Sequence, residues 1–508
     1  MKRSAFNLSH SVRSTMKMGS LVPILSQEVI PGDSYSLNSQ ILVRLTPLLA
    51  PIMGEINVFT YYFFVPNRLI WSDFPKFITT GEDGQDTTEW PHFVLSSPVA
   101  KSSLDDYLDV PVGCNGKSIS ALPARAYNLI YNEWFRDENL IDKVAISTGN
   151  GVDNITSRVL LNKCWEKDRF TSALPWPQKG TAVTLPLGDS APVRGNGTSL
   201  QITDGTNTRS LRFSTQTIGL NTGAGGLATG ATSTSQVAFP SEKALGIASS
   251  GNSGLEADLS EATSAKITSM RYAFALQKFF ERNARRGNRY VEWLLSHFGV
   301  RSPDARLQRP EYLGGGKSPV VVSEVLQTSS TDSTSPQGNM AGHAFSVQTG
   351  VNGFTKSFTE HGFIIGLACV LPRTLYQNGL DPKYFRTSPF DYATPEFTHI
   401  GESAITNKEV FAQAADPDGI WGYRPRYDEY RHSLSRVHGE FTDTYNYWVP
   451  TRIFSELPPL NDEFVTANPT DRISVVTGSD NVLLSVGHQI TCVSCLPKSG
   501  DPGLIDHM

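Results

Sequence analysis

One stretch of the sequence has the residue types of a nucleotide site. Residues 307–322 are LQRPEYLGGGKSPVVV, in which three glycines precede Lys317 and Ser318. A phosphate-binding loop, G-x-x-x-x-G-K-[ST], follows a buried strand and opens a helix, because its backbone amides and the helix N-terminus hold the phosphate. Here Glu311 occupies the first glycine position, and Pro319 and a run of valines follow. The sequence therefore predicts no nucleotide site, and we interpret the glycines as a backbone turn that permits close packing.

Cysteines and acidic residues offer two further kinds of site. Cys492 and Cys495 form a lone C-x-x-C with His488 nearby, in a stretch typical of paired strands, and buried thiols explain it more simply than metal or redox chemistry. The acidic stretches GEDGQD (81–86) and ADPDG (415–419) could hold a structural Ca²⁺, although neither has EF-hand spacing and turn chemistry explains both. The sequence also lacks the catalytic motifs G-x-S-x-G and H-E-x-x-H, so we expect no enzyme, no catalytic residue and no cofactor. A structural Ca²⁺ at one of the acidic stretches is the one exception that we consider.

Basic residues gather in two segments that could contact nucleic acid. The first nineteen residues contain no Asp or Glu, and such a segment suits phosphate neutralisation by counterion release. A predicted amphipathic helix within 258–299 carries a second group on one side. The first nineteen residues, called here the basic arm, could instead be a frayed terminus whose charge is incidental. The basic side of the helix could instead face solvent or another subunit. The candidate contacts are Lys2, Arg3, Arg13 and Lys17 in the arm, and Lys278, Arg282, Arg285 and Arg289 in the helix.

The composition of the whole chain favours a β-rich protein. The 508 residues are 39% hydrophobic and 18% charged, with 42 glycines and 31 prolines, which suits strands, turns and long connections. The formal charge of -5 argues against a chain that coats nucleic acid with its whole surface. We expect a cytoplasmic protein without membrane insertion, because the sequence shows neither a signal peptide nor an apolar run long enough to span a bilayer.

Two segments have clear periodicity. Residues 55–71 alternate as in a strand that is apolar on both faces, which predicts that both faces are covered. One face carries Ile56, Val58, Tyr62 and Phe64, and the other carries Phe59, Tyr61 and Phe63. In residues 121–140, Pro123 suits a first helical turn, and Tyr127, Ile130, Tyr131 and Trp134 follow helical spacing. This aromatic stripe is typical of a helix that packs on a core.

The chain divides into three predicted regions. Residues 188–255 are rich in Gly, Thr, Ser and Asn and cannot build a large core, so they are predicted to form a surface insertion. Residues 1–187 and 256–508 carry strands at both ends of the chain, with helices between them. This arrangement predicts one antiparallel sandwich whose loops have grown into subdomains.

Several strings resemble a known family in an ordered series. LPARAYNLIYNEWFRDENL, TSALPWPQKG, RRGNRYVEWLLSHFGV and PDARLQRPEYLGG resemble major capsid proteins of the Microviridae, small tailless phages with circular single-stranded DNA. EHGFIIGL, YQNGLDPKYFRTSPFDYATPEFTHIGE and SRVHGEF continue the series over nearly the whole chain apart from the insertion. The N-terminal string RSAFNLSHSVRSTMKMGSLVPILSQEVIPGDSY and the place of the insertion resemble the gokushovirus branch.

The resemblance implies a mainly β fold, an eight-stranded antiparallel jelly roll with helix-containing insertions. It implies a T=1 icosahedral shell of identical subunits that is assembled in the host bacterial cytoplasm and encloses the single-stranded DNA genome. A small basic DNA-binding virion protein is the implied partner, and the insertion the implied host-receptor contact near three-fold axes. Because aromatic side chains anchor subunit contacts, the predicted assembly residues are Tyr127, Trp134, Phe135 and Tyr312.

The alternative function is a carbohydrate-binding or carbohydrate-active β-sandwich. The Trp and Tyr content suits glycan contact, but a glycosidase needs an acid pair beside an aromatic cleft, and no spacing in the sequence marks such a pair.

Overall fold

The computed structural model describes most of the chain outside the Gly/Thr/Ser-rich segment. The described residues are 3–82, 84–183, 267–286, 289–326, 328 and 340–498, with short strands between 193 and 257. The chain forms two compact units, one of Met1–Lys179 with Glu281–Met508 and one of Gly180–Phe280. Most of the predicted insertion, residues 188–255, lies outside the described residues, so the predicted region boundaries stay a prediction.

The larger unit is an eight-stranded antiparallel jelly roll. Its strands alternate between two sheets along the chain from β2 to β5, and the sheet orders are β2-β21-β4-β17 and β3-β18-β5-β15. The first sheet contains β2 (His10–Met16), β21 (Val482–Ser494), β4 (Ser34–Leu45) and β17 (Met340–Ser357), and is extended by β1 (Ser4–Asn7) and β16 (Val321–Leu326). The second contains β3 (Val22–Val29), β18 (Gly362–Pro372), β5 (Ile56–Pro66) and β15 (Glu311–Pro319). The predicted jelly roll is therefore confirmed.

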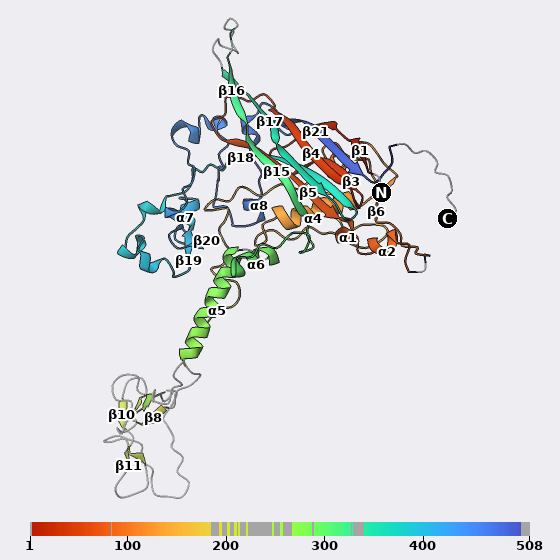
Figure 1. Cartoon of the computed structure of the whole chain (residues 1–508). Helices are drawn as coiled ribbons and strands as arrows, with labels where there is room; N and C mark the ends of the chain where they lie inside the picture. Colours follow the sequence, from red (N-terminus) through yellow and green to blue (C-terminus); the bar gives the residue numbers. More distant parts are fainter. Residues whose placement is uncertain are drawn as a thin grey trace. The chain divides into compact units, whose positions relative to one another are not determined.

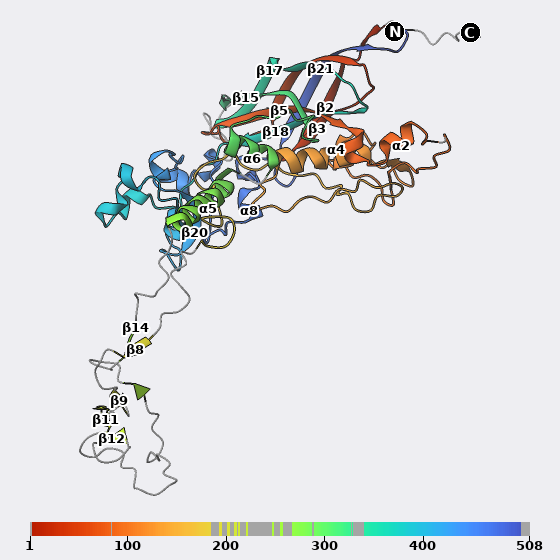
Figure 2. The ribbon, with the colours of Figure 1, turned by 60° about the horizontal axis from the view of Figure 1, so that its bottom comes forward.

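Strand β5 is buried on both faces, as its sequence predicts. Val58 packs between the two sheets, together with Ile41 of β4 and Val486 of β21. Phe63, on the other face, packs with Leu367 of β18 and Tyr127 of the helix α4 (Leu122–Ile130). Figure 2 shows the resulting layers, with β17 and β21 in one sheet, β5 and β18 in the next, and α4 and α6 beyond it.

Most helices of this unit lie in two long segments that connect strands of the jelly roll. The long connection from β5 to β15 contains α1 (Asn67–Ile70), α2 (Phe74–Ile78), β6 (His92–Val94), α3 (Leu104–Tyr107), β7 (Ser118–Ser120), α4, the π-helical turn η1 (Tyr131–Phe135) and α6 (Tyr290–Phe298). The connection from β18 to β21 contains β19 (Glu402–Thr406), α7 (Asn407–Val410), β20 (Ile420–Pro425), α8 (Asp462–Val465) and several short 3-10 helices. Figure 1 shows these segments alongside the sandwich. The predicted helix within 121–140 is confirmed as α4 and η1.

The smaller unit contains short paired strands and the start of a long helix. The pairs are β9 (Gln201–Thr203) with β10 (Thr208–Ser210) and β13 (Gly246–Ile247), β11 (Arg212–Phe213) with β12 (Leu220–Asn221), and β8 (Val193–Gly195) with β14 (Leu255–Ala257). The helix α5 (Ile267–Arg286) continues from this unit into the larger one. Within the described part of the chain, no helix is both long and apolar enough to cross a membrane.

The glycine-rich string of the sequence is not a turn, which corrects our interpretation. Gly314, Gly315 and Gly316 lie inside strand β15, which pairs with β5. A Cβ at Gly315 would lie 2.1 Å from the carbonyl oxygen of Thr60, and one at Gly316 would lie 1.9 Å from Oδ1 of Asn352. The glycines are therefore needed because β15 approaches its neighbours too closely for any side chain, so the predicted close packing is confirmed.

Candidate assembly and nucleic-acid surfaces

Tyr127 is a core residue, which corrects its assignment as an assembly contact. Its side chain is fully buried between α4 and the second sheet. The hydroxyl donates a hydrogen bond to the Leu21 carbonyl at 2.8 Å and accepts one from the Leu161 amide at 3.1 Å. Because both partners belong to the same subunit and no surface is left, Tyr127 stabilises the fold from inside and cannot reach a neighbouring subunit.

The other three predicted assembly residues lie together near the surface. Trp134 donates from Nε1 to the Pro310 carbonyl at 3.1 Å, and its ring lies 5.8 Å from that of Tyr312. Phe135 is half-buried with its ring 5.0 Å from that of Tyr61. Tyr312 is 44% exposed, so it is the member of this group with most surface to offer. Their role in assembly stays a prediction.

A group of exposed aromatic residues was missed by the sequence reasoning. Residues 381–400, called here the aromatic loop, contain Tyr384, Phe390 and Tyr392, which are 71%, 61% and 57% exposed. The side chains belong to a segment of short 3-10 turns, in which no helical or strand periodicity assigns them to a core. The available signal was the density of aromatic residues in a segment interrupted by three prolines.

The aromatic loop is held in one conformation by its own polar contacts. The Asp391 carboxylate accepts hydrogen bonds from the amides of Thr387 at 2.9 Å and Ser388 at 2.8 Å. These two bonds hold the pKa of Asp391 below its ordinary value. The guanidinium of Arg386 lies over the rings of Tyr392 and Tyr430, 5.5 and 4.3 Å from their centroids. A fixed, exposed aromatic surface costs little entropy when it binds a partner.

Helix α6 is a second exposed apolar surface. Its sequence, YVEWLLSHF, is largely apolar, yet none of its residues is buried. Tyr290 and Phe298 are 63% and 66% exposed at its two ends. A largely apolar helix that the described part of its own subunit covers only in part is typical of a contact with another protein.

The predicted basic arm is an integral part of the first sheet. Strands β1 and β2 both pair antiparallel with β21, and Arg13 lies opposite Ser485 in that register. The alternative interpretation of a frayed terminus is therefore wrong for residues 3–16. Arg3, Arg13 and Lys17 are exposed, and none of them forms an ion pair with a described residue. Lys2 lies outside the described residues.

The predicted basic helix carries side chains that are already neutralised. Arg285 forms an ion pair with Glu402, and although burial raises the pKa of Glu402, the Arg285 guanidinium opposes that shift. Arg289 binds Glu138 at 2.9 Å and also donates to two backbone carbonyls. These two arginines join segments of the larger unit. Lys278 is exposed, so it is more accessible to a partner than Arg282 and Arg289, which are both half-buried.

The motifs that suggested other chemistry have structural explanations. Lys317 binds Glu166, with Nζ 3.0 Å from Oε1, instead of standing at a phosphate site. Cys492 points into the sandwich from β21, and burial raises the pKa of its thiol. In the acidic stretches, Asp86 pairs with Lys76 and Asp418 with Lys408. Within the described ranges, no three His, Cys, Asp or Glu side chains are grouped to hold a metal ion, and the Ca²⁺ prediction stays untested.

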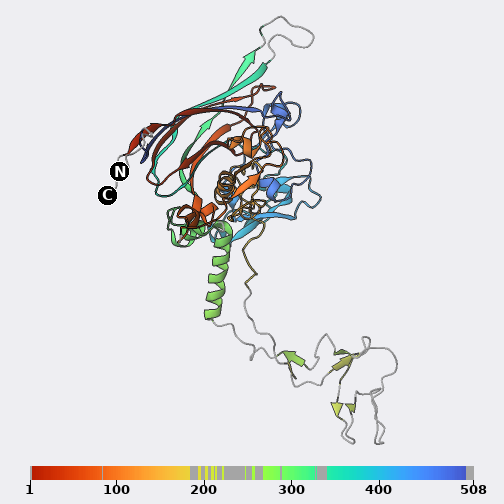
Figure 3. The same cartoon turned by 90° about the vertical axis from the view of Figure 1, so that its right-hand side faces the viewer.

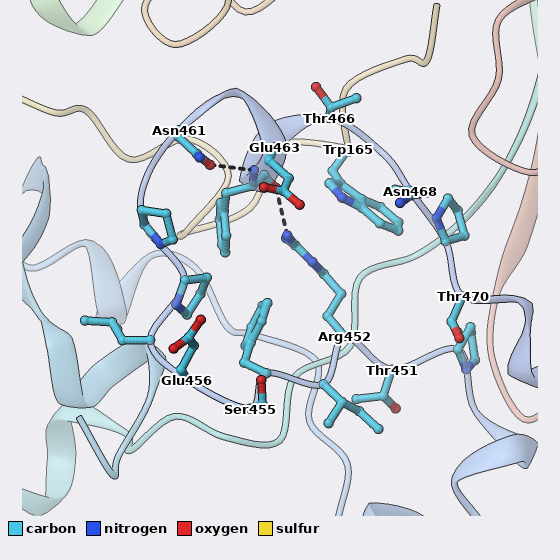
Figure 4. Close-up of a pocket in the computed structure, with 18 of the residues that line it drawn as sticks. Trp165, Thr451, Arg452, Ser455, Glu456, Asn461, Glu463, Thr466, Asn468 and Thr470 are labelled. Atoms are coloured by element: carbon cyan, nitrogen blue, oxygen red, sulfur yellow. Dashed lines mark hydrogen bonds between the residues drawn. The ribbon is translucent and has the colours of Figure 1, made fainter. Parts of the chain in front are cut away.

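A cavity of about 470 Å³ lies between Trp165 and the segment 450–472. Figure 4 shows Arg452 extending into it, with Nη2 donating to the Phe464 carbonyl at 2.7 Å. The guanidinium also lies over the rings of Phe464 and Trp165, 4.2 and 5.2 Å from their centroids. Since its contacts come from the cavity walls, Arg452 stabilises this segment and offers no reactive group.

The fold and these surfaces define the class of the protein. A jelly roll with long insertions, an ordered aromatic loop and a partly exposed apolar helix is the architecture of a viral shell subunit, which must contact several copies of itself. A family model described as "Capsid protein (F protein)" matches residues 1–504, and the chain belongs to this family.

The relatives of the chain carry the same description. The chain is 39% identical to "Capsid protein VP1" of Bdellovibrio phage phiMH2K, over 94% of this chain and 90% of the relative. It is 37% identical to "Capsid protein VP1" of Chlamydia phage 1, over 99% and 96%, and 33% identical to that of Spiroplasma virus 4, over 94% and 90%. The predicted resemblance to gokushovirus-like capsid proteins is confirmed, and the carbohydrate alternative is not favoured.

Proposed function

We propose that this capsid protein is the subunit of a T=1 icosahedral shell, assembled in the cytoplasm of a host bacterium, that encloses a single-stranded DNA genome. The observation that carries the assembly proposal is the aromatic loop. Tyr384, Phe390 and Tyr392 expose large apolar areas on a segment that hydrogen bonds already hold in place. Symmetry brings such a surface against the same partner surface in every copy, so one good contact is repeated throughout the shell.

Replacing both Tyr384 and Phe390 by serine is expected to prevent assembly without unfolding the subunit. Interface aromatic residues contribute about 2 kcal/mol or more each, so each substitution should raise the concentration needed for assembly roughly 30-fold. Sedimentation velocity measures the assembled fraction, and thermal unfolding checks the subunit. Tyr384→Phe with Phe390→Tyr is the matched control, because it keeps both rings and should assemble. Shells formed by the serine variant at the wild-type concentration would count against the proposal.

A basic partner is proposed because the subunit itself is acidic. The chain carries 49 acidic and 44 basic residues, a formal charge of -5, whereas a packaged genome adds one negative charge per nucleotide. The subunits cannot balance that charge as a whole. A small basic DNA-binding protein inside the particle supplies the missing positive charge, and basic patches on the subunit supply the remainder.

Host recognition is proposed for the Gly/Thr/Ser-rich insertion, which lies largely outside the described residues. The support is its composition, which cannot form a core, and its separation from the jelly roll in the sequence. Deleting residues 195–251 is expected to leave assembly intact and to lower adsorption to host cells at least tenfold. The measurement is the fraction of labelled particles that binds to cells. Unchanged adsorption of the shortened particles would remove this role.

A further inference from the structure

The two sheets of the jelly roll are covered differently. The second sheet is packed on one side against the first sheet and on the other against α4 and its neighbouring segments. The first sheet has a packed inner face, but its opposite face, called here the outer sheet face, is exposed. Arg44 on β4 and Leu483 on β21 lie opposite each other on this face, and both are exposed. Figure 3 shows the strands of the sandwich on one side of the larger unit and the helical insertions on the other.

Acidic side chains are almost absent from the outer sheet face. Asp and Glu make up 49 of the 508 residues, yet β1, β2, β4, β17 and β21 contain neither. In β16, Glu324 lies opposite Gly342 and alternates with the outward residues Val321, Ser323 and Val325. Asp480 reaches one end of the face, where it accepts hydrogen bonds from Thr15 and Ser102. The remaining described surface of the face carries no negative charge.

The cations on and beside this face have no acidic partner. Arg13 lies opposite Ser485, and Arg44 lies two strands away opposite Leu483. Lys17 follows β2 on the same side, and Arg3 precedes β1. None of the four forms an ion pair with a described residue, in contrast to Arg285 and Arg289. Their charge is therefore available to an anionic partner.

The remaining outward residues are suited to phosphate and base contacts. Hydroxyl and amide side chains, which bind phosphate oxygens in many protein–DNA interfaces, follow the central strands. Phe345 and Val347 supply apolar area beside them and are 37% and 57% exposed. The outward polar residues are Ser34, Ser36, Asn38 and Gln40 on β4, and Ser485, Gln489 and Thr491 on β21.

We infer that the outer sheet face binds the backbone of single-stranded DNA, an assignment that rests on the proposed enclosure of a genome. Charge complementarity decides between DNA and a second subunit. A self-complementary contact would bring Arg13 and Arg44 of one copy near the same cations of another, with no acid on either side to compensate. Subunit contacts are enriched in aromatic residues, Met and Arg and depleted in Ser. This face has several serines and no Tyr or Trp among its outward residues, while Phe345 and the arginines would suit either partner.

The test is the salt dependence of binding between the full-length chain and a single-stranded oligonucleotide. Arg13→Gln with Arg44→Gln should make the slope of log Kobs against log salt less negative by about 1.4, since each phosphate contact on a single strand contributes about 0.7. Both side chains are exposed, so the fold should persist. Arg301→Gln with Arg306→Gln is the matched control, because both arginines are exposed and lie outside the sheet. The control should keep the wild-type slope.

Each contrary outcome has a distinct meaning. The assignment of DNA to this face would be overturned if the Arg13/Arg44 variant kept the wild-type salt slope. It would also be overturned if the Arg301/Arg306 variant showed an equally large change in that slope. Normal DNA binding with loss of shell assembly would show that another subunit covers the face, which also overturns it. If the wild-type chain binds no single-stranded DNA, the proposed enclosure of a genome by direct contact fails, and this inference fails with it.

Discussion

Replacing Arg125 by methionine is expected to destabilise the subunit by about 3–5 kcal/mol, because the substitution leaves a buried carboxylate without its partner. Arg125 is completely buried in α4, and its Nε donates to Asp153 at 2.8 Å. Its Nη1 donates to the carbonyls of Ile70 at 2.9 Å and Gly149 at 3.0 Å. One side chain therefore joins α4 to two other segments, the end of α1 and the loop 149–153.

The carboxylate of Asp153 depends on the same network. Burial alone would raise its pKa, but hydrogen bonds from Thr156 and Arg125 outweigh burial and hold the pKa below the ordinary value. Without Arg125 the charge stays buried and loses its cation. Urea unfolding, monitored by circular dichroism, measures the change in the free energy of unfolding.

Arg158→Met is the matched control for this prediction. Arg158 pairs with Asp105, with Nε 3.1 Å from Oδ2, but its side chain is one-third exposed. Solvent screens that pair, so its loss should cost only about 1 kcal/mol or less. A similar small loss for Arg125→Met would contradict the role given to the buried pair.

Acidification is expected to weaken the jelly roll through His488, by up to about 3 kcal/mol between pH 6.5 and pH 4. His488 is buried between the sheets, and Nε2 donates to the Ile24 carbonyl at 2.9 Å. Nδ1 accepts from the Ser39 hydroxyl at 2.8 Å, which in turn accepts from the Tyr62 hydroxyl at 2.6 Å. This arrangement fits the neutral imidazole, because a proton on Nδ1 would displace the hydroxyl hydrogen that Ser39 donates to it.

The sign of the effect follows from the pKa of His488. Burial lowers that pKa from 6.5 to about 4, so in this range the unfolded chain binds a proton that the folded subunit does not. The stabilisation is fully present above pH 6.5 and is lost as the pH falls to about 4. Each pH unit contributes about 1.4 kcal/mol for one such group, which gives the expected total of about 3 kcal/mol.

Urea unfolding at several pH values separates His488 from other groups. A His488→Gln subunit cannot titrate at this position, so its stability should fall less steeply between pH 6.5 and pH 4. His10→Gln is the control, because His10 is exposed and its ring lies 5.2 Å from that of His488. That variant should keep most of the wild-type slope. Equal slopes for the wild type and His488→Gln would show that another group controls the acid sensitivity.

Local periodicity in the sequence predicts parts of the fold well. Strand β5 alternates apolar residues on both faces, and both faces are indeed covered. The spacing of Tyr127 and Ile130 predicts the core-facing side of α4. The pairing of distant strands needs more than periodicity, and here the jelly roll followed from the family resemblance. The glycines of β15 show why local periodicity is not enough. The strands and side chains that exclude a Cβ at these positions come from other parts of the chain.

The surfaces were harder to predict for the same reason. Nothing near Arg285 in the sequence shows that Glu402 neutralises it, because the two residues are 117 positions apart. Arg13 keeps its charge free because β2 joins β21, a strand from the other end of the chain. A run of basic residues therefore does not reveal which charges are available to DNA. The exposed aromatic loop likewise has no periodic pattern to mark it.

The central claim is that this chain forms a closed shell by itself or with its virion partners. Electron microscopy of the purified full-length protein, with its mass measured by analytical ultracentrifugation, tests that claim most directly. We predict uniform icosahedral particles, or symmetric building blocks that close into them as the concentration rises. A stable monomer at high concentration, with no larger species in the images, would contradict the account.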